Sequence, residues 1–462
     1  MTFPPEFSAR ALTEAVHSGA ISLKEITEEF ATRADDAAAD PASSGVATSL
    51  AQRAVDRADE LSTEAPHPAG GGARDLFGLP VAVKDLFPID GVECTMGSAN
   101  LTFTAAETAK PVTKLLARGA VLTATTHTSE VGMTAYTEPI GLTAPHNPYF
   151  GASEEEGDTP LTPGGSSGGS AVAVATGVVP AALGSDGGGS IRVPAACCGL
   201  VGLKPAHDIS SGNLATPAFL TRTLDDAALL AGLPRATSGS TRLADRASRP
   251  LRIGVTTSPF HAEVDVDKRW SAGAWAAADR LADAGYDVVE VDSPYDPAGP
   301  DAFEIFRRTI TRMAAKLPQA DYSEMVQWIR ASGQGIRAED AARTHNQRLA
   351  LPTMIRSRWD VDAVITPTLA FDPPRIGYFS ELESSEDFDE QTRWTPWLSL
   401  WNLTGWASLS VPVSAPVSVP LPAPATAAHD HANPPLTSVN IGAVRCGEAE
   451  LLQIAAALNP RS

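Results

Sequence analysis

Two serines in a glycine-rich stretch are the residues of this chain best suited to nucleophilic chemistry. Ser190 follows three consecutive glycines in GSDGGGSIR, and Ser166 lies upstream in GGSSGGS. Small neighbours leave the approach of a substrate open, and their backbone N–H groups can converge as an oxyanion hole. A tight turn without chemistry explains the same composition. The candidate oxyanion donors are Gly187, Gly188, Gly189 and Ser190.

A serine nucleophile needs a base, and the residues alone leave two kinds of base open. His127 and His207 are the histidines nearest in sequence to the glycine-rich region, although each is more typical of a structural or surface position. Lys84 ends the apolar run LPVAVKD, where burial would lower its pKa and allow the neutral amine to accept a proton. An ordinary surface pair of Lys84 and Asp85 would explain the same sequence.

Other catalytic motifs fit poorly. Residues 164–168 match the G-x-S-x-G pattern of α/β-hydrolases, but the preceding EEEGDTPLTP makes a poor strand. The sequence has no P-loop, no H-E-x-x-H motif and no cysteine–histidine cluster, so we expect neither a metal nor a cofactor. His429 and His431 lie in a proline-rich stretch, and we expect them to bind nothing.

A longer pattern carries a resemblance to a known family. PGGSSGGSAVAVATGVVPAALGSDGGGSIRVPAACCGLVGLKP at 163–205, preceded by GLPVAVKD at 78–85, resembles the amidase signature family. The resemblance continues in WNLTGWASLSVP at 401–412 and SVNIGAVRCGEAELL at 438–452. It implies a single catalytic domain over 1–462, with the α/β amidase-signature fold, in which helices surround a large mixed central β-sheet.

The resemblance also implies a catalytic triad. By motif position, Ser190 corresponds to the family's nucleophile, Ser166 to the serine preceded by a cis peptide bond, and Lys84 to the general base. The implied reaction converts a carboxylic amide to its acid and ammonia or an amine, through an acyl-enzyme on Ser190. The family resemblance thereby favours Lys84 over any histidine as the base.

Three further residues of the signature segment are expected to support the site. We expect Ser167 to assist by hydrogen bonding, Asp186 to order the glycine loop, and Arg192 to brace the turn after the nucleophile. All three roles are structural rather than catalytic.

The departures from the family pattern fall where the substrate is shaped. ATTHTSE at 124–130 lacks a lysine that the family often has there, and AHDISSG at 206–212 replaces a common Gly-Arg turn. The identity of the small-molecule amide therefore stays open. Esters are an alternative substrate class because the same acyl-enzyme serves both. A glutaminase component of an amidotransferase complex is a further alternative, which these departures disfavour.

The rest of the chain must position these residues, and its pattern indicates an α/β protein. Apolar runs predict strands at 251–256, 286–291 and 361–366, and amphipathic stretches between them predict helices at 268–285 and 338–357. Alternating strands and helices of this kind build a sheet with helices packed on it.

The single domain divides into regions by composition. We expect a helical N-terminal region over 1–65, in which Ser22 begins a second helix, and a catalytic core over 78–205. Residues 412–435 hold seven prolines and are expected to form a surface loop. Four of the eight tryptophans fall within 394–406, a spacing more typical of a core than of a partner surface.

Charge and composition exclude several classes of protein. The 462 residues include 35 Lys and Arg against 55 Asp and Glu, a net charge of −20, without a basic run that could bind nucleic acid. The longest apolar run, 171–183, is too short to cross a membrane, and no signal peptide is evident. Four cysteines are too few for a disulfide scaffold. We therefore expect a cytoplasmic enzyme, with the oligomeric state, a homodimer included, left open.

Overall fold

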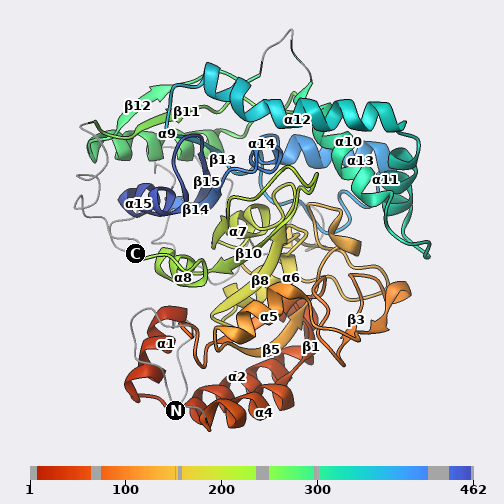
Figure 1. The fold of residues 1–462 in the computed structure, drawn as a ribbon, viewed down its shortest axis with the longest axis vertical. Coiled ribbons are helices and arrows are strands. Elements are labelled where there is room, and N and C mark those ends of the chain that lie inside the picture. The colour runs from red at the N-terminus through yellow and green to blue at the C-terminus, as the bar shows by residue number, and fades with distance from the viewer. Residues whose placement is uncertain are drawn as a thin grey trace.

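A mixed sheet of eleven strands runs through the described part of the chain (Figure 1). The computed structural model describes residues 8–63, 74–150, 152–153, 159–235, 249–295, 299, 301–414 and 436–458. The strands of the large sheet are β1 (Val46–Ser49), β2 (Pro80–Lys84), β5 (Val121–Thr126), β8 (Ala181–Asp186), β9 (Val201–Lys204), β10 (Thr216–Thr221), β11 (Arg252–Val255), β12 (Asp287–Glu290), β13 (Ala363–Pro367), β14 (Ser408–Ser414) and β15 (Leu436–Ala443).

Parallel and antiparallel ladders are both present in this sheet. Its strand order is β1-β5-β2-β8-β10-β9-β14-β15-β13-β11-β12. Strand β2 pairs in parallel with β5 and β8, and β11 pairs in parallel with β12 and β13. The ladders from β8 through β10, β9, β14 and β15 to β13 are antiparallel. Two small hairpins join β3 (Glu93–Cys94) to β4 (Phe103–Thr104) and β6 (Ala152–Ser153) to β7 (Thr159–Pro160).

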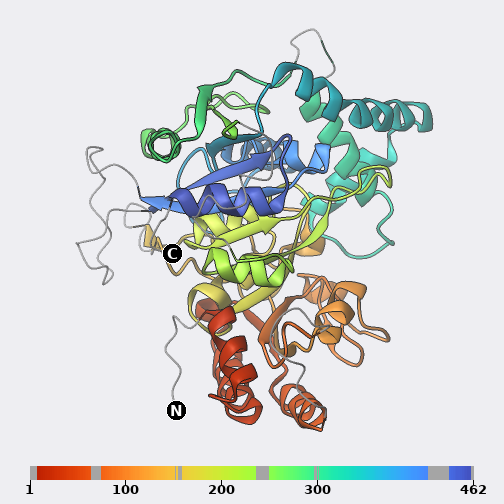
Figure 2. The same cartoon turned by 60° about the vertical axis from the view of Figure 1, so that its left-hand side comes forward.

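Helices cover the sheet and extend beyond both of its ends. In Figures 1 and 2, α1, α2 and α4 lie at one end of the molecule, whereas α10 to α13 gather at the other. Short 3-10 turns occur at Ala99–Leu101 and Glu130–Gly132. The helices are α1 (Ala9–Ser18), α2 (Leu23–Ala38), α3 (Pro41–Ser44), α4 (Ala51–Ser62), α5 (Lys110–Ala117), α6 (Gly168–Ala175), α7 (Arg192–Cys197), α8 (Leu224–Leu230), α9 (Lys268–Asp283), α10 (Ala302–Ala314), α11 (Glu324–Gln334), α12 (Ala338–Arg358), α13 (Ser384–Trp394), α14 (Ser399–Thr404) and α15 (Glu448–Leu458).

Strand alternation decides which residues face the site. Successive side chains of a strand point to opposite faces of the sheet. Ala82 of β2 and Ala182 of β8 pack in one apolar cluster with residues of α6 and α7, whereas Val83 and Leu183 pack in another on the opposite face. By the same alternation, Lys84 and Asp186, the last residues of β2 and β8, face α6 and α7. They lie at the same edge of the sheet because the two strands are parallel.

The predicted strands and helices between 251 and 366 agree closely with the structure. The three predicted strands correspond to β11, β12 and β13, and the two predicted helices to α9 and α12. Helix α2 begins after Ser22, whose hydroxyl accepts from the Glu25 N–H while the Glu25 carboxylate accepts from the Ser22 N–H. This reciprocal cap satisfies two backbone donors that a helix start leaves open. Trp394, Trp397 and Trp401 are fully buried, as expected of core residues.

Two predicted boundaries are wrong in part. The N-terminal region is not purely helical, because β1 pairs with β5 at the edge of the sheet. That edge position lets a short stretch of mixed polarity, VATS, form a strand without a strongly apolar pattern. The predicted loop at 412–435 begins too early, because β14 continues to Ser414 against β15. Residues 415–435 lie outside the described part of the chain.

Within the described part of the chain, no helix combines the length and the apolar character that crossing a bilayer requires.

Candidate active site

The end of β2 brings Lys84 to the glycine-rich loop that precedes α6. Lys84 Nζ donates a 2.7 Å hydrogen bond to Ser166 Oγ and a 3.3 Å hydrogen bond to Ser185 Oγ. Ser185 lies near the end of β8, the parallel neighbour of β2, which places its hydroxyl within reach of the Lys84 amine. The structure therefore brings together Lys84 and Ser166, two residues that are far apart in the sequence.

Lys84 is fully buried, and its surroundings disfavour the charged amine. Burial lowers the pKa of Lys84 to about 7, although the negative charge of Asp186 acts in the opposite direction. A charged lysine loses hydration in such a position, so the neutral amine becomes accessible near neutral pH. The alternative of a surface pair between Lys84 and Asp85 is wrong, since both residues are buried and Asp85 accepts hydrogen bonds from Thr95.

Hydrogen bonds from threonine hydroxyls to backbone carbonyls hold the loop that carries Ser166. The Gly165–Ser166 peptide bond is cis. The Ser166 carbonyl accepts a 3.0 Å hydrogen bond from the Thr128 hydroxyl, and the Thr137 hydroxyl donates to the Gly164 carbonyl at 2.8 Å. A Cβ at Gly165 would lie 2.4 Å from the Tyr136 carbonyl oxygen, so only glycine fits there. The sequence reasoning missed Thr128 and Thr137, because hydroxyls that bind backbone carry no motif of their own.

The turn after β8 presents Ser190 beside this loop. The Ser190 carbonyl accepts from the Ser167 N–H at 3.3 Å, which ties the two glycine-rich turns together. The Gly189 N–H donates to Asp186 Oδ1 at 2.9 Å and is therefore engaged within the turn. Among the described residues, the N–H groups of Gly187, Gly188 and Ser190 meet no acceptor, so three of the four expected oxyanion donors are unengaged.

One link of the implied triad is not formed in this structure. Among the described residues, no hydrogen bond joins the hydroxyls of Ser190 and Ser166. Ser190 and Gly165, the neighbour of Ser166, line the same pocket, whereas Ser166 itself is buried behind that lining. Catalytic hydrogen bonds often tighten only when substrate is bound.

A buried ion pair braces the turn that carries Ser190. Arg192 donates two hydrogen bonds to the Asp186 carboxylate, at 2.8 and 2.9 Å, and both side chains are completely buried. Burial alone would raise the pKa of Asp186, but the charge and hydrogen bonds of Arg192, with help from Lys204 and Asn402, hold it well below its ordinary value. This geometry fits the supporting roles expected of Asp186 and Arg192 in ordering the glycine turn.

Asn402 completes this cluster and was not singled out from the sequence. Its amide nitrogen donates to the Asp186 carbonyl and carboxylate at 3.0 Å, and its oxygen accepts from Arg192 at 2.7 Å. The available signal was an amide side chain in the tryptophan-rich WNLTGW, since a buried amide requires partners. Ser167 makes a further contact, because its hydroxyl donates to the Ser185 carbonyl at 3.4 Å.

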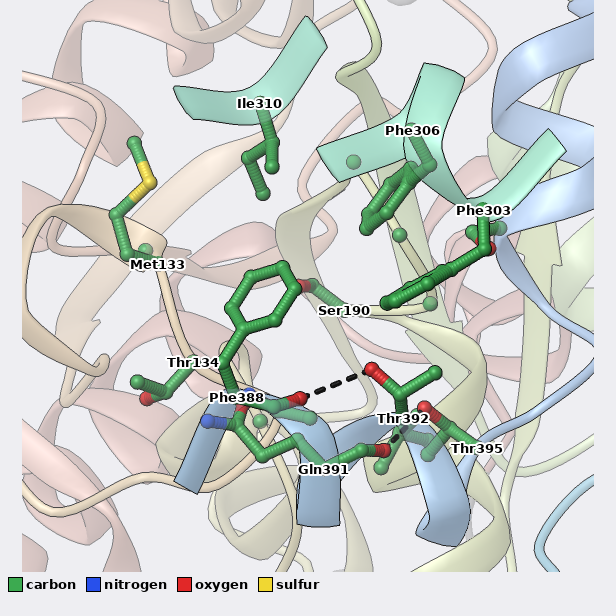
Figure 3. Close-up of a pocket in the computed structure, with 18 residues that line it drawn as sticks. Met133, Thr134, Ser190, Phe303, Phe306, Ile310, Phe388, Gln391, Thr392 and Thr395 are labelled. Carbon is green, nitrogen blue, oxygen red and sulfur yellow. Dashed lines mark hydrogen bonds between the residues drawn. The ribbon is translucent and has the colours of Figure 1, made fainter. Parts of the chain in front are cut away.

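An open pocket with about 640 Å³ of empty volume lies over Ser190 (Figure 3). Helix α10 contributes Phe303, Phe306 and Ile310, and Figure 3 shows these side chains pointing toward the space in front of Ser190. Phe388 of α13 enters the same space from the other side. A substrate at Ser190 would therefore contact a largely apolar wall.

The histidines considered as bases lie elsewhere. His127 is buried, its Nδ1 has no hydrogen-bond partner among the described residues, and burial lowers its pKa to about 4. His207 contacts Lys204 Nζ at 3.2 Å rather than either serine. In the part of the chain that the structure describes, no group of three histidine, cysteine, aspartate or glutamate residues is arranged to hold a metal ion.

Comparison with known proteins decides the family. A profile described as Amidase matches residues 25–430. The chain belongs to the amidase signature family. A similar relative is the putative amidase AmiB2 of Mycobacterium tuberculosis (strain ATCC 25618 / H37Rv), which is 35% identical over 375 residues, 77% of this chain and 79% of that protein. This amidase is thus a hydrolase of carbon–nitrogen bonds.

Two other proteins extend the comparison. A glutamyl-tRNA(Gln) amidotransferase subunit from Halorhodospira halophila (strain DSM 244 / SL1) is 36% identical over 304 residues, 61% of this chain and 60% of that protein. The solved structure of 6-aminohexanoate cyclic dimer hydrolase superposes with a TM-score of 0.77 at 24% identity, over 99% of this amidase and 97% of that chain. The latter likeness establishes the shared fold, a large mixed sheet with surrounding helices.

Proposed function

We propose that this amidase hydrolyses a small carboxylic amide through an acyl-enzyme on Ser190, with Ser166 as proton relay and Lys84 as general base. The observation that carries the proposal is the 2.7 Å contact between Lys84 Nζ and Ser166 Oγ in a fully buried position. A buried lysine that contacts a serine hydroxyl at this distance is well placed to take its proton.

In the first half of the proposed reaction, neutral Lys84 accepts the Ser166 proton while Ser166 accepts the Ser190 proton. Ser190 Oγ forms a bond to the carbonyl carbon of the amide, and the carbonyl oxygen of the substrate becomes negatively charged. The unengaged N–H groups of Gly187, Gly188 and Ser190 stabilise this oxyanion. The proton then returns through Ser166 to the leaving nitrogen, the carbon–nitrogen bond breaks, and ammonia or an amine departs.

In the second half, water replaces the nitrogen. Lys84 and Ser166 remove a proton from the water molecule, whose oxygen attacks the ester carbonyl of the acyl-enzyme. The ester bond then breaks, Ser190 recovers its proton, and the carboxylic acid leaves. An ester substrate would form the same acyl-enzyme, so ester cleavage is expected as a side activity.

Hydrolysis of glutamine for an amidotransferase fits this pocket less well. The relative in Halorhodospira halophila belongs to such a complex by name. Glutamine carries an ammonium and a carboxylate, which require oppositely charged or strongly polar partners when they are buried. Of the eighteen described residues that line the pocket, none carries a charge at neutral pH.

The test is hydrolysis of a panel of primary amides, from acetamide to benzamide, followed by ammonia release. We expect turnover by the wild-type protein, and loss of at least about 10³-fold in kcat for Ser190→Ala with an unchanged melting temperature. Ser211→Ala, which alters an exposed serine outside the pocket, serves as the matched control. Turnover by Ser190→Ala at the wild-type rate would overturn the proposed mechanism.

A further inference from the structure

The pocket over Ser190 has one wall made of aromatic rings. The rings of Phe303 and Phe306 are nearly parallel, with an interplanar angle of 24° and centroids 6.3 Å apart, and the Phe388 ring lies 6.1 Å from that of Phe303. Phe306 also lies against the oxyanion turn, since a Cβ at Gly188 would be 2.9 Å from its Cζ. An apolar, flat group bound at Ser190 would therefore rest on these rings.

Most side-chain hydroxyl and amide groups that line this pocket already donate a hydrogen bond to another group of the protein. The hydroxyl of Thr134 donates to the Tyr136 carbonyl, and those of Thr392 and Thr395 donate to carbonyls of α13, each at 2.9 Å. The Gln391 amide nitrogen donates to a buried aspartate at 2.7 Å. Apart from Ser190, the remaining hydroxyl in the described lining belongs to Ser399.

Ser399 lies at the start of α14, beside the turn at 187–190 that carries Ser190. The carbonyl of the preceding residue, Leu398, accepts a 2.9 Å hydrogen bond from Arg192, and the Leu398 side chain contacts Gly189. Ser399 is buried, with 6% of its surface exposed, yet it lines the same pocket as Ser190. The backbone of this position is therefore fixed relative to the nucleophile.

A buried histidine connects Ser399 to a tyrosine. His261 Nδ1 lies 2.8 Å from Ser399 Oγ, and His261 Nε2 lies 2.7 Å from the Tyr295 hydroxyl. Burial lowers the pKa of His261 to about 3, so its ring is neutral and carries a single proton. Ring packing against Tyr295 and Phe303, with centroids 5.5 and 6.0 Å away, holds the imidazole in place.

Two directions satisfy this chain, because the donor and acceptor roles of the His261 ring nitrogens depend on its tautomer. We assign the Tyr295 O–H as the donor to Nε2, because a phenol is a better donor than acceptor and an unprotonated imidazole nitrogen is a strong acceptor. The single ring proton of His261 is then on Nδ1 and donates to Ser399 Oγ. With this assignment the Ser399 proton has no acceptor among the described residues, and Ser399 lines the pocket over Ser190.

We propose that the Ser190 pocket takes uncharged amides with an apolar aromatic body that carries one hydrogen-bond acceptor, and that Ser399 donates the hydrogen bond to that acceptor. Only the choice of amides rests on the proposed function. Ser399 is then a specificity-determining residue, and His261 is a positioning residue that acts through it. An acceptor that matches a buried donor gains affinity, whereas a ligand without one leaves the Ser399 hydroxyl unpaired.

The test measures binding to Ser190→Ala protein, so that it does not depend on hydrolysis. The probes are benzamides with an acetyl group at ring position 2, 3 or 4, each paired with its isopropyl twin of similar shape but without an acceptor. We expect at least one acetyl isomer to bind about tenfold more tightly than its twin in calorimetry. Adding Ser399→Ala should remove this difference and leave the affinity for the isopropyl twin within about twofold.

Two further variants separate positioning from a loss of fold. His261→Phe keeps an aromatic ring between Tyr295 and Phe303 but removes the donor to Ser399, so we expect it to reduce the acetyl preference. Thr404→Val removes a hydroxyl of the same helix that donates to the Leu400 carbonyl, and it should leave the preference unchanged. The acetyl preference persisting in Ser399→Ala would overturn the proposal.

Two other outcomes would overturn it as well: equal binding of acetyl and isopropyl probes at every ring position, or glutamine binding as tightly as the benzamides. Hydrolysis of the same benzamides by the wild-type protein is measured separately. Absence of hydrolysis contradicts the proposed function, whereas absence of the acetyl preference contradicts the role of Ser399. The two failures are therefore distinguishable.

Discussion

Lys84 Nζ lies 2.7 Å from Ser166 Oγ, at the buried end of β2. The contact joins the end of β2 to the loop before α6, 82 positions later in the chain. Burial lowers the pKa of Lys84 to about 7, so the neutral amine that the proposed mechanism needs is accessible near neutral pH.

The first prediction concerns Lys84 itself. Lys84→Met should lower kcat for amide hydrolysis by at least about 10³-fold, because it removes the acceptor for the Ser166 proton. Lys204→Met is the matched control, since burial also lowers the pKa of Lys204 to about 7 but its amine contacts backbone carbonyls and His207 instead of a serine. A comparable loss of kcat in both variants, measured by ammonia release, would argue against a specific role for Lys84.

The second prediction is an acid limb in the pH profile. Burial lowers the pKa of Lys84 to about 7, so the neutral base predominates above that pH and the protonated form below it. We expect kcat/KM for benzamide to be level in mild alkali and to fall about tenfold per pH unit well below pH 7. A profile that stays flat from about pH 8 to about pH 5.5, within the range where the protein remains folded, would contradict Lys84 as base.

The third prediction tests the contact between the turn at 187–190, which carries Gly188, and Phe306 of α10. In Gly188→Ala the new methyl group would lie 2.9 Å from Phe306 Cζ, so the turn or the ring must move. We expect kcat/KM to fall about 10- to 100-fold, because small misplacements of catalytic groups have large effects. Phe306→Leu should restore part of the loss in the double variant.

Gly335→Ala provides the control for this substitution, because its nearest neighbour would be an ordinary 3.6 Å away. Its kinetics should match those of the wild-type protein. If Gly188→Ala and the double variant were equally impaired, the ring contact would not be what places the turn.

The fourth prediction concerns stability. Arg192→Met leaves the buried Asp186 carboxylate without its cation, which should lower the free energy of unfolding by about 3–5 kcal/mol in urea denaturation. Arg337→Ala breaks an exposed ion pair with Glu339, and its effect should stay below about 1 kcal/mol. Adding Asp186→Asn to Arg192→Met should recover part of the stability, whereas equal effects of the two arginine variants would contradict the bracing role.

Long-range patterns in the sequence predicted the sheet and much of the site. Apolar runs with turn residues at their ends located β11, β12 and β13, and the signature segment predicted the Lys84–Ser166 pair. The strand at Val46–Ser49 was missed, because four residues of mixed polarity show no strand pattern and depend on the partner β5.

Contacts between distant segments were not predictable from one sequence. Asn402 reaches Asp186 across 216 positions, and the Ser399–His261 pair spans 138. An asparagine or a serine in a sequence does not show which residue it will bind. These hydrogen bonds form only when α14 packs against the rest of the fold. The hydrogen bond from the Gly189 N–H to Asp186 was not predictable either. A run of consecutive glycines does not show which of its N–H groups bind within the turn.

Covalent trapping shows whether Ser190 is the residue that carries the acyl group. The protein is incubated with a fluorophosphonate, which reacts with activated serine hydroxyls, and the labelled peptide is identified by mass spectrometry. We expect one adduct on Ser190, absent in Ser190→Ala and strongly slowed in Lys84→Met. An adduct on another residue, or labelling at an unchanged rate in Ser190→Ala, would contradict it.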